Sequence, residues 1–535
     1  MGSFMKTRYI VNSLLCIGIL QFLLLNWGVE TIGNEVMQAS QWCMMFLRGG
    51  VFLVMLLALL RWRREWRFEQ MFGTALVVSA VMESVYAIFQ VYGLLEPNNA
   101  LFKLTGTFYN PGPLGGYLAM AFVVALNRYM SRDKVSNVER KCMQIAMFII
   151  LFTLLVTLSR TAWIAALVGV LFVLSCHNDW VREVKRYRRY FIVGLCALLL
   201  IFSVVLYLKW DSAIGRLFLW YISFRAILDA PLMGHGSFTL AYGEAQERYF
   251  ATGSYSEKMA EIAGSPEYAF NEYLDFGVRY GLIALIVLLV LLVIMVRIGI
   301  KKRLYEMVAV QIVLMVFAIA SYPMHIPVFF AVAIVLVAGV VVSAETKDHL
   351  VGGIILPALL IMGWSYREAC ARVERIESVD KAHKYYILGE WKQAANLYSL
   401  EEKNIPEEAG YLFEYGHALH QIGKWEQSTT VLLRVANFNS DPMIFNIIGE
   451  NMKEIGNFEY SEMYYKKSVD RLPNRMYPHF LLFQLYSTDD YWNEEKRKQE
   501  ADIILTRHFK VESTATKEMR QEVKKQLLTH NQRAK

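Results

Sequence analysis

Cysteines and charged residues are both scarce in this sequence. Only six of the 535 residues are cysteines, with no C-x-x-C pair and no Cys/His cluster, which excludes a disulfide framework and a structural zinc site. Charged residues make up 19% of the chain and hydrophobic residues 55%. This balance, with a mean hydropathy of +0.31, excludes an ordinary soluble chain and is typical of a membrane protein.

The hydrophobic residues are concentrated in residues 1–366, whereas residues 367–535 are polar. About eleven apolar runs are long enough, or nearly so, to cross a bilayer; they lie near 9–27, 41–60, 71–92, 114–127, 142–158, 161–176, 191–208, 273–296, 304–322, 327–343 and 351–366. The first run follows a basic start without a clear cleavage site, so we expect an uncleaved span. The sequence predicts an all-α fold, with a polytopic helical membrane bundle over 1–366 and a separate domain over 367–535.

Basic residues cluster in every second loop between these runs. The clusters lie within 61–67, 128–141, 182–189 and 297–303. Loops of this kind face the cytoplasm, which predicts that the N-terminus lies inside. The long polar loop 209–272 and the C-terminal domain are then expected outside. Since topology accounts for the basic clusters, we expect no nucleic-acid partner.

The polar C-terminal part contains an internal repeat. Gly389, Gly423 and Gly456 follow one another at spacings of 34 and 33 residues, with an aromatic residue two positions after each glycine. Pro442 and Pro473 close two of the units. A period near 34 with a glycine at the turn is the tetratricopeptide pattern, so the sequence predicts an α-solenoid of stacked helical hairpins. Such arrays bind peptides or protein partners, or pack on their own membrane domain, and these alternatives stay open.

Two arginines are candidates for ligand binding. Arg160 lies between two apolar runs in LLVTLSRTAWIAAL, where an arginine is costly unless it pairs, faces a wet cavity or snorkels to the interface. Arg216 and Trp220 lie four residues apart in a helix-compatible run that we expect to end before Pro231, so they share a face. Guanidinium and indole together suit an anionic ligand that carries sugar. Anchoring to a lipid headgroup is the alternative role for Arg216.

Histidines in two outer loops are candidate bases. His235 lies in a Pro-Leu-Met-Gly-His-Gly turn, whose glycines allow close approach of the backbone. His325 lies between two spans in SYPMHIPVFF and competes with His235 on equal grounds, since either imidazole suits proton transfer near neutral pH. Asn110, in the turn TGTFYNPGP, is expected in a fixed loop over the next span and is a further candidate for substrate binding.

Polar residues precede and begin the apolar run near 273. The Ser-Pro pair at 265–266 is expected to form the N-cap and first turn of a helix. Asn271 and Glu272 are candidates for positioning a sugar hydroxyl. Asp275 and Arg279 lie one turn apart and are better explained as an intrahelical ion pair than as catalytic groups.

Four stretches, taken in order and spacing, resemble the O-antigen ligase and polymerase superfamily of bacterial envelopes. They are GTFYNPGPLGGYLAM, LSRTAW, GRLFLWYISFRAILDAPLMGHGSF and FNEYLDFGVRYGLIAL. The resemblance implies a multi-pass protein of the bacterial inner membrane with a periplasmic repeat domain. It also implies transfer of a glycan from an undecaprenyl-diphosphate carrier to a lipid or protein acceptor hydroxyl on the periplasmic face, without metal or cofactor.

The resemblance further implies roles for single residues. Arg160 and Arg216 match the positions of two arginines that hold the diphosphate, and two guanidinium groups can neutralise the charge on a departing diphosphate. Phe270 stands where the family commonly has a histidine, which leaves His235, Glu272 or the substrate itself as base. Ligase and repeat-unit polymerase stay open as activities. A non-catalytic envelope assembly protein, whose repeats recruit a protein partner, is the remaining alternative.

Overall fold

The computed structural model describes residues 68–131, 136–177, 210–343, 377–403, 410–509 and 512–533, together with residues 367, 371, 374, 375 and 405. Every regular element within this part of the chain is a helix, as the sequence predicts. Contacts divide the chain into two compact units. The first comprises the described residues of Met1–Ala213, Phe270–Tyr273 and Ala284–Ala369, and the second those of Ile214–Ala269, Leu274–Ile283 and Cys370–Lys535.

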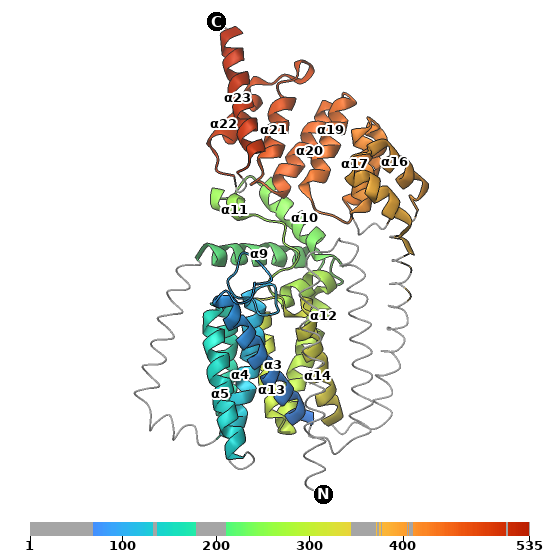
Figure 1. Cartoon of the computed structure of the whole chain (residues 1–535). Coiled ribbons are helices and arrows are strands. Elements are labelled where there is room, and N and C mark those ends of the chain that lie inside the picture. Colours follow the sequence, from blue (N-terminus) through green and yellow to red (C-terminus); the bar gives the residue numbers. More distant parts are fainter. Residues whose placement is uncertain are drawn as a thin grey trace. The chain divides into compact units, whose positions relative to one another are not determined.

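The first unit is a bundle of mostly apolar helices. They are α3 (Phe68–Val91), α4 (Pro111–Met130), α5 (Asn137–Val156), α6 (Arg160–Cys176), most of α12 (Glu272–Lys301), α13 (Tyr305–Ala318), the 3-10 turn η2 (Pro323–His325) and α14 (Pro327–Ser343). The central helix is α4, which packs on α3, α5, α6 and α13. Figure 1 shows α3, α4, α5 and α13 side by side.

Two glycines bring α4 close to its neighbours. A Cβ atom on Gly115 would lie 3.0 Å from the Cβ of Ala162, and one on Gly116 would lie 2.6 Å from the ring of Phe317. A larger side chain at either position would push α6 or α13 away from α4, because the core is already close-packed. The small residues of the GG pair therefore set the spacing of three helices.

The helices agree with the predicted apolar runs wherever the structure describes them. A helix covers all or most of each of the runs near 71–92, 114–127, 142–158, 161–176, 273–296, 304–322 and 327–343; α13 ends at Ala318, four residues before the end of its run. The runs near 9–27, 41–60, 191–208 and 351–366 lie outside the described residues. Among the described helices, α3 and α12 are long and apolar enough to cross a membrane, and α6, α13 and α14 are shorter apolar helices. The count of about eleven spans stays a prediction.

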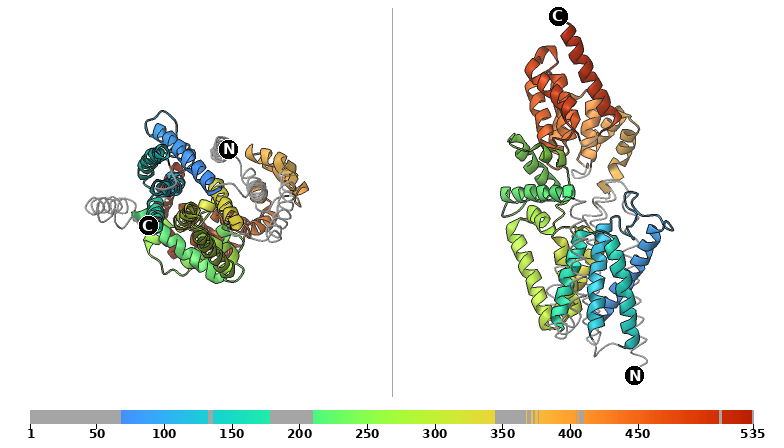
Figure 2. Two further views of the ribbon diagram at one scale, coloured as in Figure 1. Left: turned by 90° about the horizontal axis from the view of Figure 1, so that it is seen from below. Right: turned by 90° about the vertical axis from the view of Figure 1, so that its left-hand side faces the viewer.

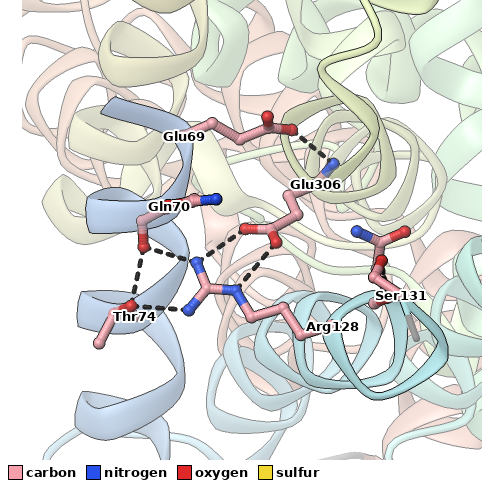
Figure 3. Close-up of polar contacts among 7 residues, drawn as sticks. Glu69, Gln70, Thr74, Arg128, Ser131 and Glu306 are labelled. Atoms are coloured by element: carbon pink, nitrogen blue, oxygen red, sulfur yellow. Dashed lines mark hydrogen bonds and ion pairs between the residues drawn. The ribbon is translucent and has the colours of Figure 1, made fainter. Parts of the chain in front are cut away.

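A buried ion pair joins the helix ends where α4 stops and α3 and α13 begin (Figure 3). Arg128 donates from Nε and Nη2 to the two carboxylate oxygens of Glu306, each at 2.9 Å, and the two side chains are 6% and 9% exposed. Arg128 also donates to Thr74 Oγ1 at 2.6 Å and to the Gln70 carbonyl at 2.5 Å, while Glu69 accepts the backbone N–H of Glu306. The paired geometry and the added bonds make burial of these charges tolerable, and the network fastens three helices together.

The second unit combines the long polar loop with the C-terminal part. The loop contributes α9 (Trp210–Asp229, from Ile214 onward), α10 (Phe238–Ala251) and α11 (Glu257–Ile262). The C-terminal part contributes helical residues 377–387, then α16 (Trp391–Leu400), α17 (Tyr411–Gln421), α18 (Trp425–Val435), α19 (Pro442–Glu454), α20 (Phe458–Arg471), α21 (Met476–Leu485), η3 (Asp489–Tyr491), α22 (Glu494–Thr506) and α23 (Thr514–Arg533). From α16 to α23 each α-helix packs on the next, which Figure 1 and Figure 2 show as a stack.

The three repeat glycines occupy turns, as their spacing predicts. Gly389, Gly423 and Gly456 have φ angles of 76°, 78° and 87°, a left-handed conformation that glycine adopts at little cost. Each lies in the connection between two successive helical segments. The glycine turns and the sequential packing agree with a helical-hairpin array, and its assignment as a tetratricopeptide array stays a prediction.

The long loop docks on the C-terminal helices through α10 and α20. Arg471 donates from Nε and Nη2 to Glu247 Oε2 at 2.8 and 2.5 Å, and its side chain is only 3% exposed. The Gln246 amide donates to the Arg471 carbonyl at 2.7 Å, and the Asn474 amide donates to the Ala263 carbonyl at 2.6 Å. The loop and the C-terminal part are therefore held by specific, buried polar contacts.

Candidate functional site

Two turns in the first unit share an uncommon construction. Leu158 and Phe270 both have left-handed backbone, with φ angles of 50° and 49°. Two residues later a helix begins, at Arg160 for α6 and at Glu272 for α12. A bulky residue in this conformation costs on the order of 1–3 kcal/mol and persists only where its surroundings fix it. Each turn therefore presents a candidate site residue from a strained, fixed corner.

The turn before Arg160 is tightly packed in the bundle. Ser159 Cβ would lie 3.1 Å from a Cβ on Gly115, and Thr161 Oγ1 donates to the Ala320 carbonyl at 3.3 Å. Ser159 is the N-cap of α6, yet its side chain makes no capping hydrogen bond within the described residues. The N-terminal N–H groups of α6 and the half-buried Arg160 guanidinium together make this corner positive, which favours binding of an anion.

Glu272 and His325 form a pair in the same unit. Glu272 Oε1 accepts the Met324 backbone N–H at 2.7 Å and lies 3.4 Å from His325 Nδ1. The His325 and Glu272 side chains are 19% and 14% exposed. The ring of Phe270 packs edge-on against Tyr322, with centroids 5.3 Å apart. Because an ionised carboxylate only accepts hydrogen bonds, it favours the tautomer with the proton on Nδ1.

Asn110 and Asn271 each have a structural role at a helix start. Asn110 is the N-cap of α4, and its Oδ1 accepts the Gly112 N–H at 2.8 Å. Asn271 Oδ1 accepts the Tyr273 N–H at 3.0 Å in the same manner at the start of α12. These bonds satisfy backbone donors that helix geometry leaves without partners. Substrate binding by either side chain stays a prediction.

The predicted pair Arg216 and Trp220 lies on α9 in the second unit. The helix ends at Asp229, before Pro231 as predicted. Trp220 Nε1 donates to the Ala269 carbonyl at 3.1 Å, and both the Arg216 and the Trp220 side chains are half-buried. The indole is thus held in one orientation while part of its surface stays accessible, which is compatible with stacking on a sugar.

His235 is bonded to its own unit through the side chain. Its Nε2 lies 2.8 Å from the Ala226 carbonyl oxygen. Because a carbonyl only accepts, Nε2 carries the proton in this arrangement. The nitrogen that remains able to accept a proton is Nδ1, on the backbone side of the ring. His235 is therefore both a candidate base and a structural link to α9.

The His235 turn also closes a break in α12. Gly281, with φ of 81° and ψ of 174°, interrupts the helix. As a result Leu282 donates its N–H to the Pro231 carbonyl at 2.7 Å, and the Val278 carbonyl accepts the His235 N–H at 2.8 Å. The loop thus supplies the hydrogen bonds that the helix loses at the break.

Glycines are required where the turn meets the break. A Cβ on Gly234 would lie 2.4 Å from the Arg279 carbonyl oxygen, and one on Gly281 would lie 2.3 Å from the Leu232 carbonyl oxygen. No other residue fits at such distances without moving the backbone, so the predicted close approach at the turn is confirmed.

The helix start predicted at the Ser-Pro pair 265–266 is wrong. Residues 263–271 are irregular, and α12 begins at Glu272. The Asp275 carboxylate holds this irregular segment by accepting the Ala269 N–H at 3.1 Å. Asp275 also pairs with Arg279 one turn later, which confirms the predicted intrahelical ion pair.

The structure brings together some of the predicted residues. Glu272 and His325 are paired, although 53 residues separate them in sequence and no local pattern indicates the pairing. Arg160 belongs to the first unit, and Arg216 and His235 belong to the second. Convergence of the two arginines on one ligand stays a prediction.

Residues 145–289 match the model of a protein family described as O-Antigen ligase. Arg160, Arg216, Trp220, His235, Asn271 and Glu272 lie within the matched segment, whereas Asn110 and His325 lie outside it. Among curated proteins, none matches the chain.

Proposed function

We propose that this chain, which belongs to the O-antigen ligase superfamily, is an envelope glycosyltransferase of the ligase type. Its substrates are a glycan linked to undecaprenyl diphosphate and an acceptor hydroxyl on a lipid or a protein. The reaction takes place at the periplasmic face of the bacterial inner membrane. The observation that carries the proposal is the family match over residues 145–289.

Arg160 and Arg216 hold the diphosphate of the carrier in this proposal. The positive corner at the start of α6 supports the role of Arg160, since helix N–H groups and a guanidinium both favour a phosphate. The position of Arg216 one turn before Trp220 on α9 supports a site for a charged, sugar-bearing ligand. Two guanidinium groups stabilise the charge that develops on the leaving diphosphate, so the proposed reaction requires neither a metal ion nor a nucleotide cofactor.

Alanine variants of the two arginines test the proposal. We expect Arg160→Ala and Arg216→Ala each to lower the rate of glycan transfer by at least about 100-fold, as loss of one oxyanion donor does elsewhere. Arg225→Ala is the matched control, because Arg225 is an exposed arginine on the same α9 that contacts Tyr221. Transfer is measured in cells as glycan attached at the surface, with insertion of each variant checked by immunoblot. Full activity of both arginine variants would refute the site.

A repeat-unit polymerase is the alternative activity, because it uses the same carrier and the same leaving group. Deletion of the gene separates the two: loss of glycan attachment indicates a ligase, and collapse of glycan length indicates a polymerase. The replacement of histidine by Phe270 favours a third possibility, an assembly protein that binds the carrier without transferring it. Binding of lipid-linked glycan without transfer by the purified protein would support that role.

A further inference from the structure

We propose that His325, oriented by Glu272, accepts the proton of the acceptor hydroxyl during transfer. This assignment rests on the proposed function and adds a base that lies outside the family match. It depends on the pairing of Glu272 Oε1 with His325 Nδ1 and with the Met324 backbone N–H.

The pairing gives the imidazole the form that a base needs. A carboxylate on Nδ1 fixes the proton there and leaves Nε2 with its lone pair. The same carboxylate stabilises the imidazolium that forms when Nε2 takes a proton. The Met324 N–H bond at 2.7 Å holds Glu272 Oε1 in place, so the orientation of the ring does not depend on the 3.4 Å contact alone.

The surroundings of the pair are rigid and only partly exposed. Glu272 follows the left-handed Phe270, whose ring is packed on Tyr322, so strained backbone and an aromatic contact fix the helix start. His325 is 19% exposed, which lets a hydroxyl reach the ring while most of it stays out of water. Strain at a fixed corner beside a titratable pair is a feature of functional sites.

The Glu272–His325 pair lies in the same unit as Arg160, and a short segment of the chain, from Ala320 to His325, connects the two. Thr161, the residue after Arg160, donates to the carbonyl of Ala320. Five residues after Ala320, at the end of η2, stands His325. One packed segment therefore contacts both the helix start that bears Arg160 and the carboxylate of Glu272, which places the leaving-group holder and the base on the same structural support.

His235 is less suited to the same task. Its Nε2 is committed to the Ala226 carbonyl, and no carboxylate among the described hydrogen-bond and ion-pair partners faces its ring to stabilise a positive charge. A carbonyl orients the ring but does not offset the charge of an imidazolium as a carboxylate does.

The acceptor oxygen forms a bond to the anomeric carbon of the glycan while the bond from that carbon to the diphosphate oxygen breaks. The electron pair of the broken bond leaves with undecaprenyl diphosphate, whose charge Arg160 and Arg216 offset. The acceptor proton moves to Nε2 of His325. The products are the glycosylated acceptor, undecaprenyl diphosphate and a proton that the imidazolium later releases.

The test uses membrane vesicles from a strain that lacks the chromosomal copy and expresses full-length variants. Such vesicles contain the native carrier-linked glycan and the native acceptor. The measurement is the initial rate at which glycan leaves the carrier fraction extracted with organic solvent, taken across pH 5–9. The variants are His325→Gln, Glu272→Gln and His235→Gln, with Arg160→Ala as the reference for the diphosphate site. His383→Gln is the matched control, because His383 pairs with Glu414 at similar exposure, 20% and 15%, in the C-terminal part.

We expect His325→Gln to lower the rate by about 100-fold or more, the usual contribution of a general base. Glu272→Gln is expected to move the acid limb of the rate profile to lower pH, because the imidazolium of His325 loses its neighbouring negative charge. If Glu272 only supported the structure, its replacement would lower the rate by the same factor at every pH. Phe270→His places an imidazole against Tyr322, three residues before position 325, and the double variant Phe270→His/His325→Gln is expected to regain part of the rate lost in His325→Gln. Thermal melting of each purified variant excludes unfolding as the cause.

Two results separate failure of this assignment from failure of the proposed function. If Arg160→Ala abolishes transfer while His325→Gln and Glu272→Gln keep the wild-type rate and pH profile, the base assignment is overturned and the transferase stands. The same holds if Arg160→Ala and His235→Gln lose activity while His325→Gln keeps it. If neither Arg160→Ala nor His325→Gln changes the rate, both the site and the base are overturned.

Discussion

The contact between Glu247 and Arg471 gives a stability prediction that separates buried from exposed ion pairs. Arg471 is 3% exposed and Glu247 20% exposed, so the guanidinium depends on the carboxylate far more than the reverse. Glu247→Ala leaves a buried positive charge without its partner. Arg471→Met leaves a carboxylate that reaches water and lies 3.7 Å from Lys467.

The magnitude follows from this asymmetry. Removing one partner of a buried ion pair costs about 3–5 kcal/mol, and we expect Glu247→Ala to lie in this range. Arg471→Met is expected to cost less, about 1–3 kcal/mol, mainly through the two lost hydrogen bonds. The double variant Glu247→Leu/Arg471→Met replaces both charges with apolar groups and is expected to return to within about 1 kcal/mol of the wild type.

The assay is hydrogen exchange of the α10 and α20 amides in the full-length protein, together with thermal melting in detergent. Loss of the pair is expected to speed exchange in both helices. The control is Arg248→Ala on the same α10, because Arg248 pairs with Asp229 at 51% and 42% exposure, and exposed pairs contribute about 0–1 kcal/mol. If Glu247→Ala is no more destabilising than Arg248→Ala, the reasoning from burial is refuted.

Two further predictions concern buried charges. Glu306→Leu is expected to destabilise the helix bundle by about 3–5 kcal/mol, whereas the double variant Arg128→Met/Glu306→Leu is expected to be close to neutral. Melting temperatures of the single and double variants measure the difference. Equal losses of stability in the single and double variants would contradict this prediction. Burial and the Glu247 carboxylate raise the pKa of Asp470 to about 6. Because this folded-state pKa lies above the ordinary value of 3.8, the cost of the carboxylate to stability grows as the pH rises from 3.8 to about 6 and is fully present above that. Asp470→Asn is therefore expected to raise the free energy of unfolding by about 1–2 kcal/mol at pH 7.5, a value reduced for the partial exposure of the side chain. This gain should shrink as the pH falls from about 6 to 4. A gain that does not change with pH would contradict the assignment.

The apolar helices were predictable because their signal is local. A run of apolar residues interrupted by Gly, Pro or charges marks the ends of a buried helix, and the runs at 161–176 and 327–343 coincide with α6 and α14 within one residue. The turn glycines of the repeat were predictable for the same reason, since a left-handed turn needs glycine at a fixed period.

Pairings across long sequence distances were not predictable. Arg128 is one residue of a basic cluster in the sequence, where it counts toward topology, yet its side chain is buried against Glu306, 178 residues later. Only the placement of Glu306 at the edge of an apolar run indicates that a charge there needs a partner. The helix start near 265 was mispredicted because a Ser-Pro pair is a local signal, whereas the true start is fixed by the left-handed Phe270 and by the Asn271 cap.

The sequence indicated the single residues of the candidate site, but it did not indicate which of them contact one another. Sequence motifs indicate that His325 and Glu272 are polar residues near the same side of a membrane domain. They do not indicate that one orients the other, because the contact depends on how η2 packs against the first turn of α12.

The break at Gly281 has a consequence for how much of α12 the acyl chains can surround. The segment before the break takes hydrogen bonds from a loop, and backbone of that kind cannot face acyl chains. The remaining 20 residues, Leu282 to Lys301, form an uninterrupted helix about 30 Å long, and its apolar part ends before Arg297, where the basic cluster 297–303 begins. Gly281 thus sets where the apolar part of this helix begins, and the basic cluster sets where it ends; the bilayer thickness that the helix fits without mismatch depends on both.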